Sequence, residues 1–151
     1  MDRHRFLAGA IGLSVPVLNL VRRPSPWPYA LEDLAAMPED SWGRELHDFL
    51  AGRELDYLPK YEEHDAYHAL LGYGTTVTEE LKLQAFMFGN GSATVAGRVL
   101  LALGAVVFPS KWPVLRGEYR RGRRSSPLRR FPTAALIPEP LDEVRFKMCI
   151  V

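Results

Sequence analysis

The sequence predicts an all-α fold, a single-domain helical bundle of about six helices. The chain has 151 residues, of which 47% are hydrophobic and 25% charged, an ordinary composition for one globular domain. From residue 31 onward, apolar and polar residues recur at helical spacing over segments of roughly 8 to 20 residues. No alternation of period two, which would indicate strands, is visible in the sequence.

Helix-breaking and capping residues indicate where the first predicted helices begin and end. We expect helices near residues 31–36, 40–52, 57–71, 77–88, 92–108 and 112–122. Pro38 and Asp40 precede the second helix as breaker and N-cap, and Gly52 closes it. Gly72 and Gly74 end the third helix.

The later helices differ in character. Thr76 followed by Glu79 predicts a capping box at the start of the helix near 77–88. Residues 99–108 (VLLALGAVVF) are apolar on all sides, which favours a buried core helix over contact with lipid. The block from Lys111 to Arg130 is rich in arginine, and we expect either a solvated face or a surface attracted to an anionic membrane.

Composition divides the chain into residues 1–29, 30–124 and 125–151. The first stretch holds an apolar run at residues 6–21, too short for the roughly 20 residues that span a bilayer, and then a proline-rich linker. We prefer a helix packed on the core to an interfacial segment, and both to a transmembrane helix or a signal peptide. We expect residues 30–124 to form the helical domain and residues 125–151 to form a C-terminal tail.

Charge and cysteine content exclude several classes of protein. The formal net charge of +1 is unlike the strong positive field of proteins that bind nucleic acid, so no nucleic-acid partner is expected. Cys149 is the single cysteine, so no intramolecular disulfide and no thiolate metal site is expected. These features are typical of a protein in a reducing compartment.

The third and fourth helices carry the candidate site. At about 100° per residue, His64, His68 and Asp65 share one arc of their helix. Eleven residues separate His68 from Glu80, which lies one turn into the next, antiparallel helix and can face the same point. Two imidazoles and two carboxylates would form a neutral nitrogen and oxygen site around a divalent ion.

Spacing alone leaves other interpretations open. A charged helix face is more often solvated than metal-bound. His47 and Asp48 form a second HD pair, as in phosphohydrolases with metal sites, but that interpretation leaves His68 and Glu80 unexplained. We expect His47 and Asp48 on the surface of a helix whose core residues are Trp42, Leu46, Phe49 and Leu50.

The string HDAYHALLG, with Glu80 beyond it, resembles the signature of the Coq-four family of coenzyme Q (ubiquinone) biosynthesis. That signature is HDxxH followed after eleven residues by Glu, and it matches at His64, Asp65, His68 and Glu80. The flanking segments ELDYLPKYEEHDAYH, TTVTEELKLQAFMFGNGS and EYRRGRR are similar to the short bacterial members, so the resemblance covers roughly residues 32–125.

The resemblance implies an all-helical metal protein that acts on a prenylated aromatic lipid. All four matched residues would be metal ligands and catalytic residues. The ion would be Zn²⁺, with Fe²⁺ or Mn²⁺ as alternatives, because the ligand types do not decide between them. Glu63 and Glu79 are candidates for orienting an imidazole, although exposed helix carboxylates are the simpler interpretation of both.

The activity implied is C1 decarboxylation of a polyprenylated hydroxybenzoate, by an oxidative or a non-oxidative route, which makes the protein a carboxy-lyase. The alternative is a non-catalytic, metal-stapled scaffold that presents a prenyl lipid to other quinone-biosynthesis enzymes. Either role implies a cytoplasmic protein or one peripheral at the inner face of a membrane. Phe86, Met87, Phe88 and residues 99–108 are candidates for lining a pocket for the prenyl tail.

Overall fold

The computed structural model describes residues 27–55 and 61–150 and confirms the all-α fold. The apolar run at 6–21, most of the linker and the predicted helix start at 57 lie outside the described residues. Within these residues there is no strand, only an isolated bridge between Ser41 and Pro140. The α-helices are α2 (Leu31–Ala35), α3 (Trp42–Ala51), α4 (Glu62–Leu71), α5 (Val77–Asn90), α6 (Val95–Val107), α7 (Trp112–Arg124), α8 (Thr133–Leu136) and α9 (Leu141–Lys147), with short 3₁₀ turns η1 (Pro109–Lys111) and η2 (Leu128–Arg130).

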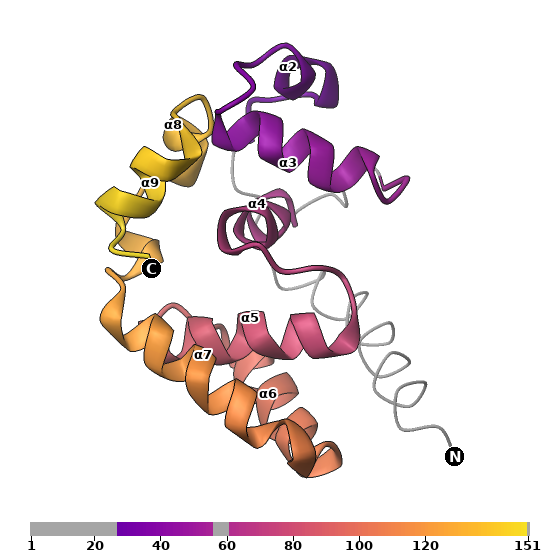
Figure 1. Cartoon of the computed structure of the whole chain (residues 1–151), viewed down its shortest axis with the longest axis vertical. Coiled ribbons are helices and arrows are strands. Elements are labelled where there is room, and N and C mark those ends of the chain that lie inside the picture. Colours follow the sequence, from indigo (N-terminus) through magenta and orange to yellow (C-terminus); the bar gives the residue numbers. More distant parts are fainter. Residues whose placement is uncertain (1–26, 56–60, 151) are drawn as a thin grey trace.

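The helices form two layers joined along one side. In Figure 1, α2 and α3 lie at the top with α4 beneath them, and α5, α6 and α7 lie at the bottom. α3 packs on α2 and α4, whereas α5 packs on α6 and α7. α8 and α9 run along the left of the view and connect the two layers.

The upper layer is tied together by buried side chains of α3 and α4. Trp42 is fully buried, and its indole Nε1 donates a hydrogen bond of 2.9 Å to the carbonyl oxygen of Ala66. Ser41, and not the predicted Asp40, is the N-cap of α3, and its hydroxyl accepts a hydrogen bond of 3.0 Å from the Arg44 amide. The prediction was wrong by one residue because two good N-cap residues are adjacent in the sequence.

The C-terminal stretch 125–151, predicted only as a tail, contains α8 and α9. Ile137, Val144 and Met148 are fully buried in the core cluster that also contains Trp42. The segment is held by backbone hydrogen bonds from Trp42 to Glu139 and from Gly43 to Ile137. These residues therefore complete the core of the upper layer.

The lower layer has a second core cluster between α5, α6 and α7. It contains Leu81, Ala85, Phe108 and Leu115, with Leu100, Leu101 and other apolar residues packed against it. The predicted burial of residues 99–108 is therefore only half correct, because α6 buries one side and leaves the other exposed.

In the described part of the chain, no single helix has the length and apolarity needed to cross a membrane. Among the described helices, one bent pair reaches that length and composition: α6 together with the segment Pro109–Arg130, which bends away from it by 107°.

Candidate metal centre

α4 presents two imidazoles on one face. His64 and His68 are four residues apart, so they lie one above the other on the helix surface. Their Nε2 atoms are 3.2 Å apart, and the rings meet edge to face at 4.8 Å between centroids. The helix ends at Gly72, whose φ of 71° is a left-handed conformation that glycine adopts at no steric cost. This turn sends the chain toward α5.

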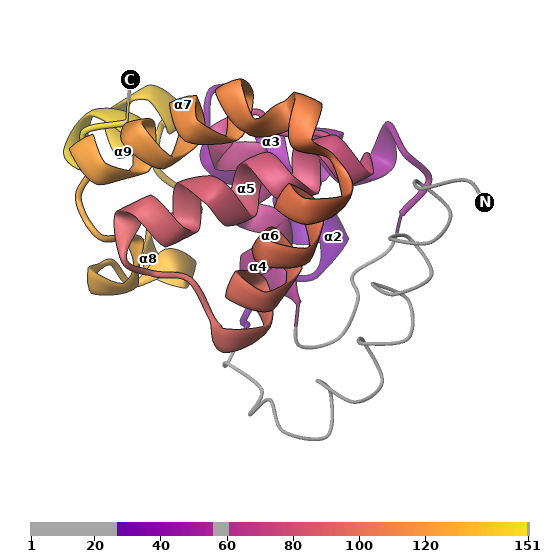
Figure 2. The same cartoon turned by 90° about the horizontal axis from the view of Figure 1, so that it is seen from below.

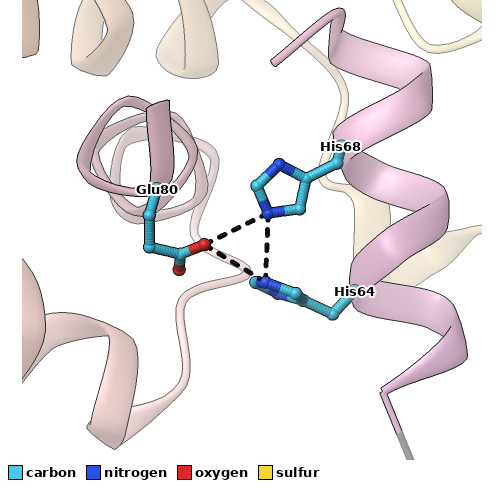
Figure 3. A group of neighbouring side chains, drawn as sticks. All are labelled: His64, His68 and Glu80. Atoms are coloured by element: carbon cyan, nitrogen blue, oxygen red, sulfur yellow. Dashed lines mark hydrogen bonds and ion pairs between the residues drawn. The ribbon is translucent and has the colours of Figure 1, made fainter. Parts of the chain in front are cut away.

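Glu80 approaches the imidazoles from the first turns of α5. Thr76 is the N-cap of α5, as predicted, and its hydroxyl accepts a hydrogen bond from the Glu79 amide. Oε2 of Glu80 lies 3.3 Å from Nε2 of His64 and 3.1 Å from Nε2 of His68. Figure 3 shows the three side chains converging on one point from the two helices. The group could hold a metal ion.

The separations within this group fit the ligand atoms of one ion. Metal bonds of about 2.0–2.1 Å place the ligands of a tetrahedral ion about 3.3–3.4 Å apart. In an octahedral site with the same bond lengths, neighbouring ligands are about 2.8–3.0 Å apart. The observed separations of 3.1, 3.2 and 3.3 Å fall within the range that these two geometries span, so the three atoms could all be ligands of one ion.

The polar atoms of the group are difficult to satisfy with protons alone. A neutral imidazole carries a proton on only one of its nitrogens, and a carboxylate carries none. The proton on one Nε2 cannot point at both of the other atoms in such a compact triangle, so at least one close pair of lone pairs or of N–H groups remains. A cation at the centre would satisfy all three atoms at once.

Burial would raise the pKa of Glu80, but hydrogen bonds from His64 and His68, together with their charges, outweigh it. The net effect holds the pKa of this carboxyl well below its usual range. Glu80 is therefore ionised at neutral pH. An ionised carboxylate is the form in which Glu binds a metal.

Aromatic neighbours fix the orientation of the imidazoles. The ring of Phe49, from α3, stacks on His68 at 5.7 Å between centroids and 20° between planes. The Arg53 guanidinium covers the same Phe49 ring at 4.2 Å. Tyr61 meets His64 edge to face at 6.3 Å. The imidazoles are thus held by packing before any ion binds.

Gln84 is a contact that sequence reasoning missed. Its side-chain amide donates a hydrogen bond of 2.7 Å to Oε1 of Glu80, one helical turn away, and the residue is buried. Oε1 is thereby occupied, which leaves Oε2 directed at the imidazoles. The sequence did contain a signal for this contact, because Gln84 is a polar residue four positions after Glu80 on the same helix.

Asp65 does not belong to the group formed by His64, His68 and Glu80. Adjacent residues of a helix point about 100° apart, so Asp65 and His64 do not face each other. Burial raises the pKa of Asp65 to about 6, an effect that the charges of His64 and His68 partly offset. Its role as a fourth ligand stays a prediction.

The two carboxylates considered as supporting residues have other partners. Glu79 forms an ion pair of 2.7 Å with Lys82, and Glu63 accepts hydrogen bonds from Tyr67 and Thr133. The hydrogen bond that Glu63 accepts from Thr133 ties the first turn of α4 to α8.

The second HD pair lies apart from this site. His47 and Asp48 are on the exposed side of α3, where Asp48 is paired with both His47 and Arg44. The opposite side of α3 is buried as expected, through Trp42, Leu46, Phe49 and Leu50.

Comparisons with known proteins support the fold. The sequence matches no family model and no curated protein. The structure is similar to a crystal structure from Nostoc punctiforme of a protein named as a candidate ubiquinone biosynthesis protein. The TM-score is 0.67 with 24% sequence identity, and the match covers 99% of this chain and 82% of the other. At this identity the likeness shows a shared fold.

Proposed function

We propose that this chain is a ubiquinone biosynthesis protein that binds one divalent ion through His64, His68 and Glu80 and acts on a prenylated hydroxybenzoate. The observation that carries the metal site is the convergence of two imidazole nitrogens and one carboxylate oxygen within 3.3 Å of one another. The name of the Nostoc punctiforme protein, together with the HDxxH and Glu signature, supports the pathway.

Charge balance favours an anionic substrate. With Glu80 as the only carboxylate in the group, a divalent ion leaves the site with one uncompensated positive charge. An exposed or substrate-filled coordination position would then attract a benzoate carboxylate or a ring phenolate. The four-ligand site predicted from the sequence, neutral as it stands, would lack this attraction.

A bound divalent ion would supply Lewis acidity that stabilises negative charge on the substrate. The chain's own residues hold and orient the ligands of the ion. α4 and Phe49 fix the imidazoles, and Gln84 fixes the carboxylate of Glu80. In the non-oxidative reaction the bond between C1 and the carboxylate carbon breaks, carbon dioxide leaves, and a proton takes its place on the ring. A product hydroxylated at C1 would indicate the oxidative route, in which carbon dioxide leaves, water supplies the hydroxyl group, and dioxygen takes up two electrons and two protons to become hydrogen peroxide.

We propose Zn²⁺ as the ion, because two histidines and one carboxylate match catalytic zinc sites with an open fourth position. Fe²⁺ and Mn²⁺ accept the same ligand types. The pocket for the prenyl tail stays a prediction: Phe86 is fully buried in the core, whereas Phe88 is exposed on the same helix.

The second candidate function is that of a scaffold. The position of the site between the two layers supports this function. α4 belongs to the upper core cluster, whereas α5 contributes side chains to both clusters. An ion held between α4 and α5 would staple the two layers of the molecule. Such a protein would present a prenyl lipid to other quinone-biosynthesis enzymes without turnover of its own.

Elemental analysis of the purified protein, with His64→Ala and the matched control His47→Ala, tests the metal site. We expect one ion per chain in the wild type and in His47→Ala, and loss of the ion in His64→Ala. Equal metal content in all three proteins would refute the site.

Incubation of the metal-loaded protein with a prenylated hydroxybenzoate then separates the two functions. Release of carbon dioxide that depends on His64 supports the enzyme. A protein that binds the lipid and the metal but gives no product supports the scaffold.

A further inference from the structure

α6 carries an exposed apolar stripe along its whole length. Val95, Val99, Leu103 and Val106 are spaced by four, four and three residues, so they lie on one side of the helix. The outermost two, Val95 and Val106, are 77% and 79% exposed. The opposite side of α6, through Gly97 and Gly104, is buried against α5. Apolar stripes of this kind mark sites of interaction.

Trp112, at the start of α7, is a further exposed apolar residue close to the end of α6. Its ring is 59% exposed, and its indole Nε1 donates a hydrogen bond of 2.7 Å to the carbonyl oxygen of Ala105, near the end of α6. Tryptophan is enriched where a protein surface passes from the apolar to the polar region of a membrane.

On α7 beyond Trp112, the exposed charged residues are all arginines. Arg116, Arg120 and Arg124 follow Trp112 at intervals of four residues, and all three are exposed. The single acid of α7, Glu118, is mostly covered, where it accepts a hydrogen bond from Tyr73 and pairs with Arg121. Figure 2 views the molecule from the side on which α6 and α7 both lie in front.

We propose that the α6 stripe, Trp112 and the arginines of α7 form a docking surface for a lipid bilayer that contains anionic lipids. Apolar side chains would enter the interface while the arginines meet lipid phosphates. α6 has 13 residues and is about 20 Å long, so it would lie in the plane of the interface.

A second copy of the chain fits this surface less well. A two-fold contact brings the same patch of both subunits together, which would place the α7 arginines of one subunit against those of the other. No exposed acid on α7 could compensate them. Charge complementarity therefore selects an anionic partner. The apolar stripe selects a lipid one.

Co-sedimentation of the full chain with vesicles tests the surface. Vesicles of phosphatidylcholine alone are compared with vesicles of phosphatidylcholine and phosphatidylglycerol. Val106→Asp should weaken binding to the anionic vesicles about tenfold, since burying one valine contributes about 1.5 kcal/mol. The matched control is Phe146→Asp on α9, where an 85% exposed phenylalanine lies outside the stripe, and it should bind like the wild type.

The combined Arg116→Glu and Arg120→Glu variant should abolish the preference for anionic vesicles. Wild-type binding by Val106→Asp, or equal binding of the wild type to both kinds of vesicle, would overturn the proposal. So would a dimer in solution that Val106→Asp dissociates without any effect on vesicle binding, because the stripe would then belong to a second copy. None of these outcomes depends on the metal site.

A separate observation concerns the contact between α5 and α6. Gly97 lies so close to Gln84 that a Cβ atom on residue 97 would be 2.0 Å from Oε1 of Gln84. The same glutamine donates to Oε1 of Glu80 through its amide nitrogen. We infer that Gln84 is a positioning residue for the metal ligand Glu80, and that Gly97 on α6 makes the space it needs. This inference rests on the proposed metal site.

Zinc dissociation constants of Gly97→Ala and Gly104→Ala provide a matched test. Both substitutions would add a methyl group to the same interface, and at Gly104 the new Cβ would lie 2.2 Å from Cδ2 of Leu81. Gly97→Ala and Gln84→Ala should weaken zinc binding about tenfold to a hundredfold, as loss of a residue that supports a ligand does. Gly104→Ala should lower the metal-free Tm and leave zinc affinity within about threefold, since no ligand partner is displaced.

Equal loss of affinity in both alanine variants, or wild-type affinity in Gln84→Ala, would overturn the role of Gln84 while the metal site stands. A wild-type protein without zinc affinity would overturn the metal site itself.

Discussion

At the scale of single residues, Asp65 separates two descriptions of the metal centre. The resemblance to the Coq-four signature implies that Asp65 is a ligand, whereas among the described residues the structure brings together His64, His68 and Glu80. Asp65→Asn should therefore lower zinc affinity by less than about tenfold, through loss of nearby negative charge alone. Competition with a chelator measures this, and Glu80→Gln is the comparison that removes a gathered ligand. A loss in Asp65→Asn as large as in Glu80→Gln would make Asp65 a fourth ligand.

Tyr73 links stability to alkaline pH. Burial raises the pKa of this phenol above its usual range, and its hydrogen bond to Glu118 adds to the shift. Above about pH 10 the unfolded chain loses the proton that the folded chain keeps, so the free energy of unfolding falls as pH rises, by up to about 1.4 kcal/mol per pH unit.

Tyr73→Phe removes this titrating group, so its free energy of unfolding should fall less steeply than that of the wild type above about pH 10. Urea unfolding of both proteins at a series of pH values measures the two slopes. Parallel slopes would show that Tyr73 ionises as easily in the folded chain as in the unfolded one.

At the scale of elements, α5 and α7 approach each other through glycine. A Cβ atom on Gly122 would lie 2.1 Å from the carbonyl oxygen of Phe86. Backbone cannot move aside as a flexible side chain can, so Gly122→Ala should destabilise the protein by about 1–3 kcal/mol. Gly117, on the same helix, has open space around its Cα, and Gly117→Ala should stabilise by up to about 1 kcal/mol. Denaturant midpoints of the two variants that move in the same direction would contradict this close approach.

The elements show what a sequence can and cannot predict. The long helices were predicted correctly because the hydrophobic periodicity and the capping residues indicate the same boundaries, as at Thr76 and Gly72. α8 and α9 were missed because four and seven residues are too few to establish a period. The exposed side of α6 was missed for a different reason: a helix that is apolar all round gives no sign of which side faces the core.

Like the helices, the candidate site could be predicted from the sequence only in part. The spacing of His64 and His68 places both imidazoles on one face, which the structure confirms. Glu80 faces them, as the antiparallel turn between the helices suggested. Gln84 and Phe49 were not predicted as neighbours of the site, because contacts between helices depend on packing that no local pattern encodes.

At the scale of the whole molecule, the candidate metal centre lies where two core clusters meet. The upper cluster contains Ala66 and Leu70 of α4, and the lower contains Leu81 of α5, one residue beyond Glu80. A ligand that binds only the folded chain stabilises it by RT ln(1 + [L]/Kd), about 2.7 kcal/mol at a hundredfold excess over Kd. Zinc should therefore raise Tm in the wild type and in His47→Ala but not in His64→Ala.

The stabilisation by zinc should be largest in the helices that hold the ion. An ion held by α4 and α5 adds a link between these helices and none to α9, so amide hydrogen exchange should slow in α4 and in the first turns of α5. α9 packs on α3 and ties to α4 through the Arg145 guanidinium, which donates to the carbonyl oxygen of Leu70 beyond His68. Its amides should gain less protection than those of α4. Slowing that is uniform along the chain, or that persists in His64→Ala, would mean that zinc acts at some place other than the junction of the two layers.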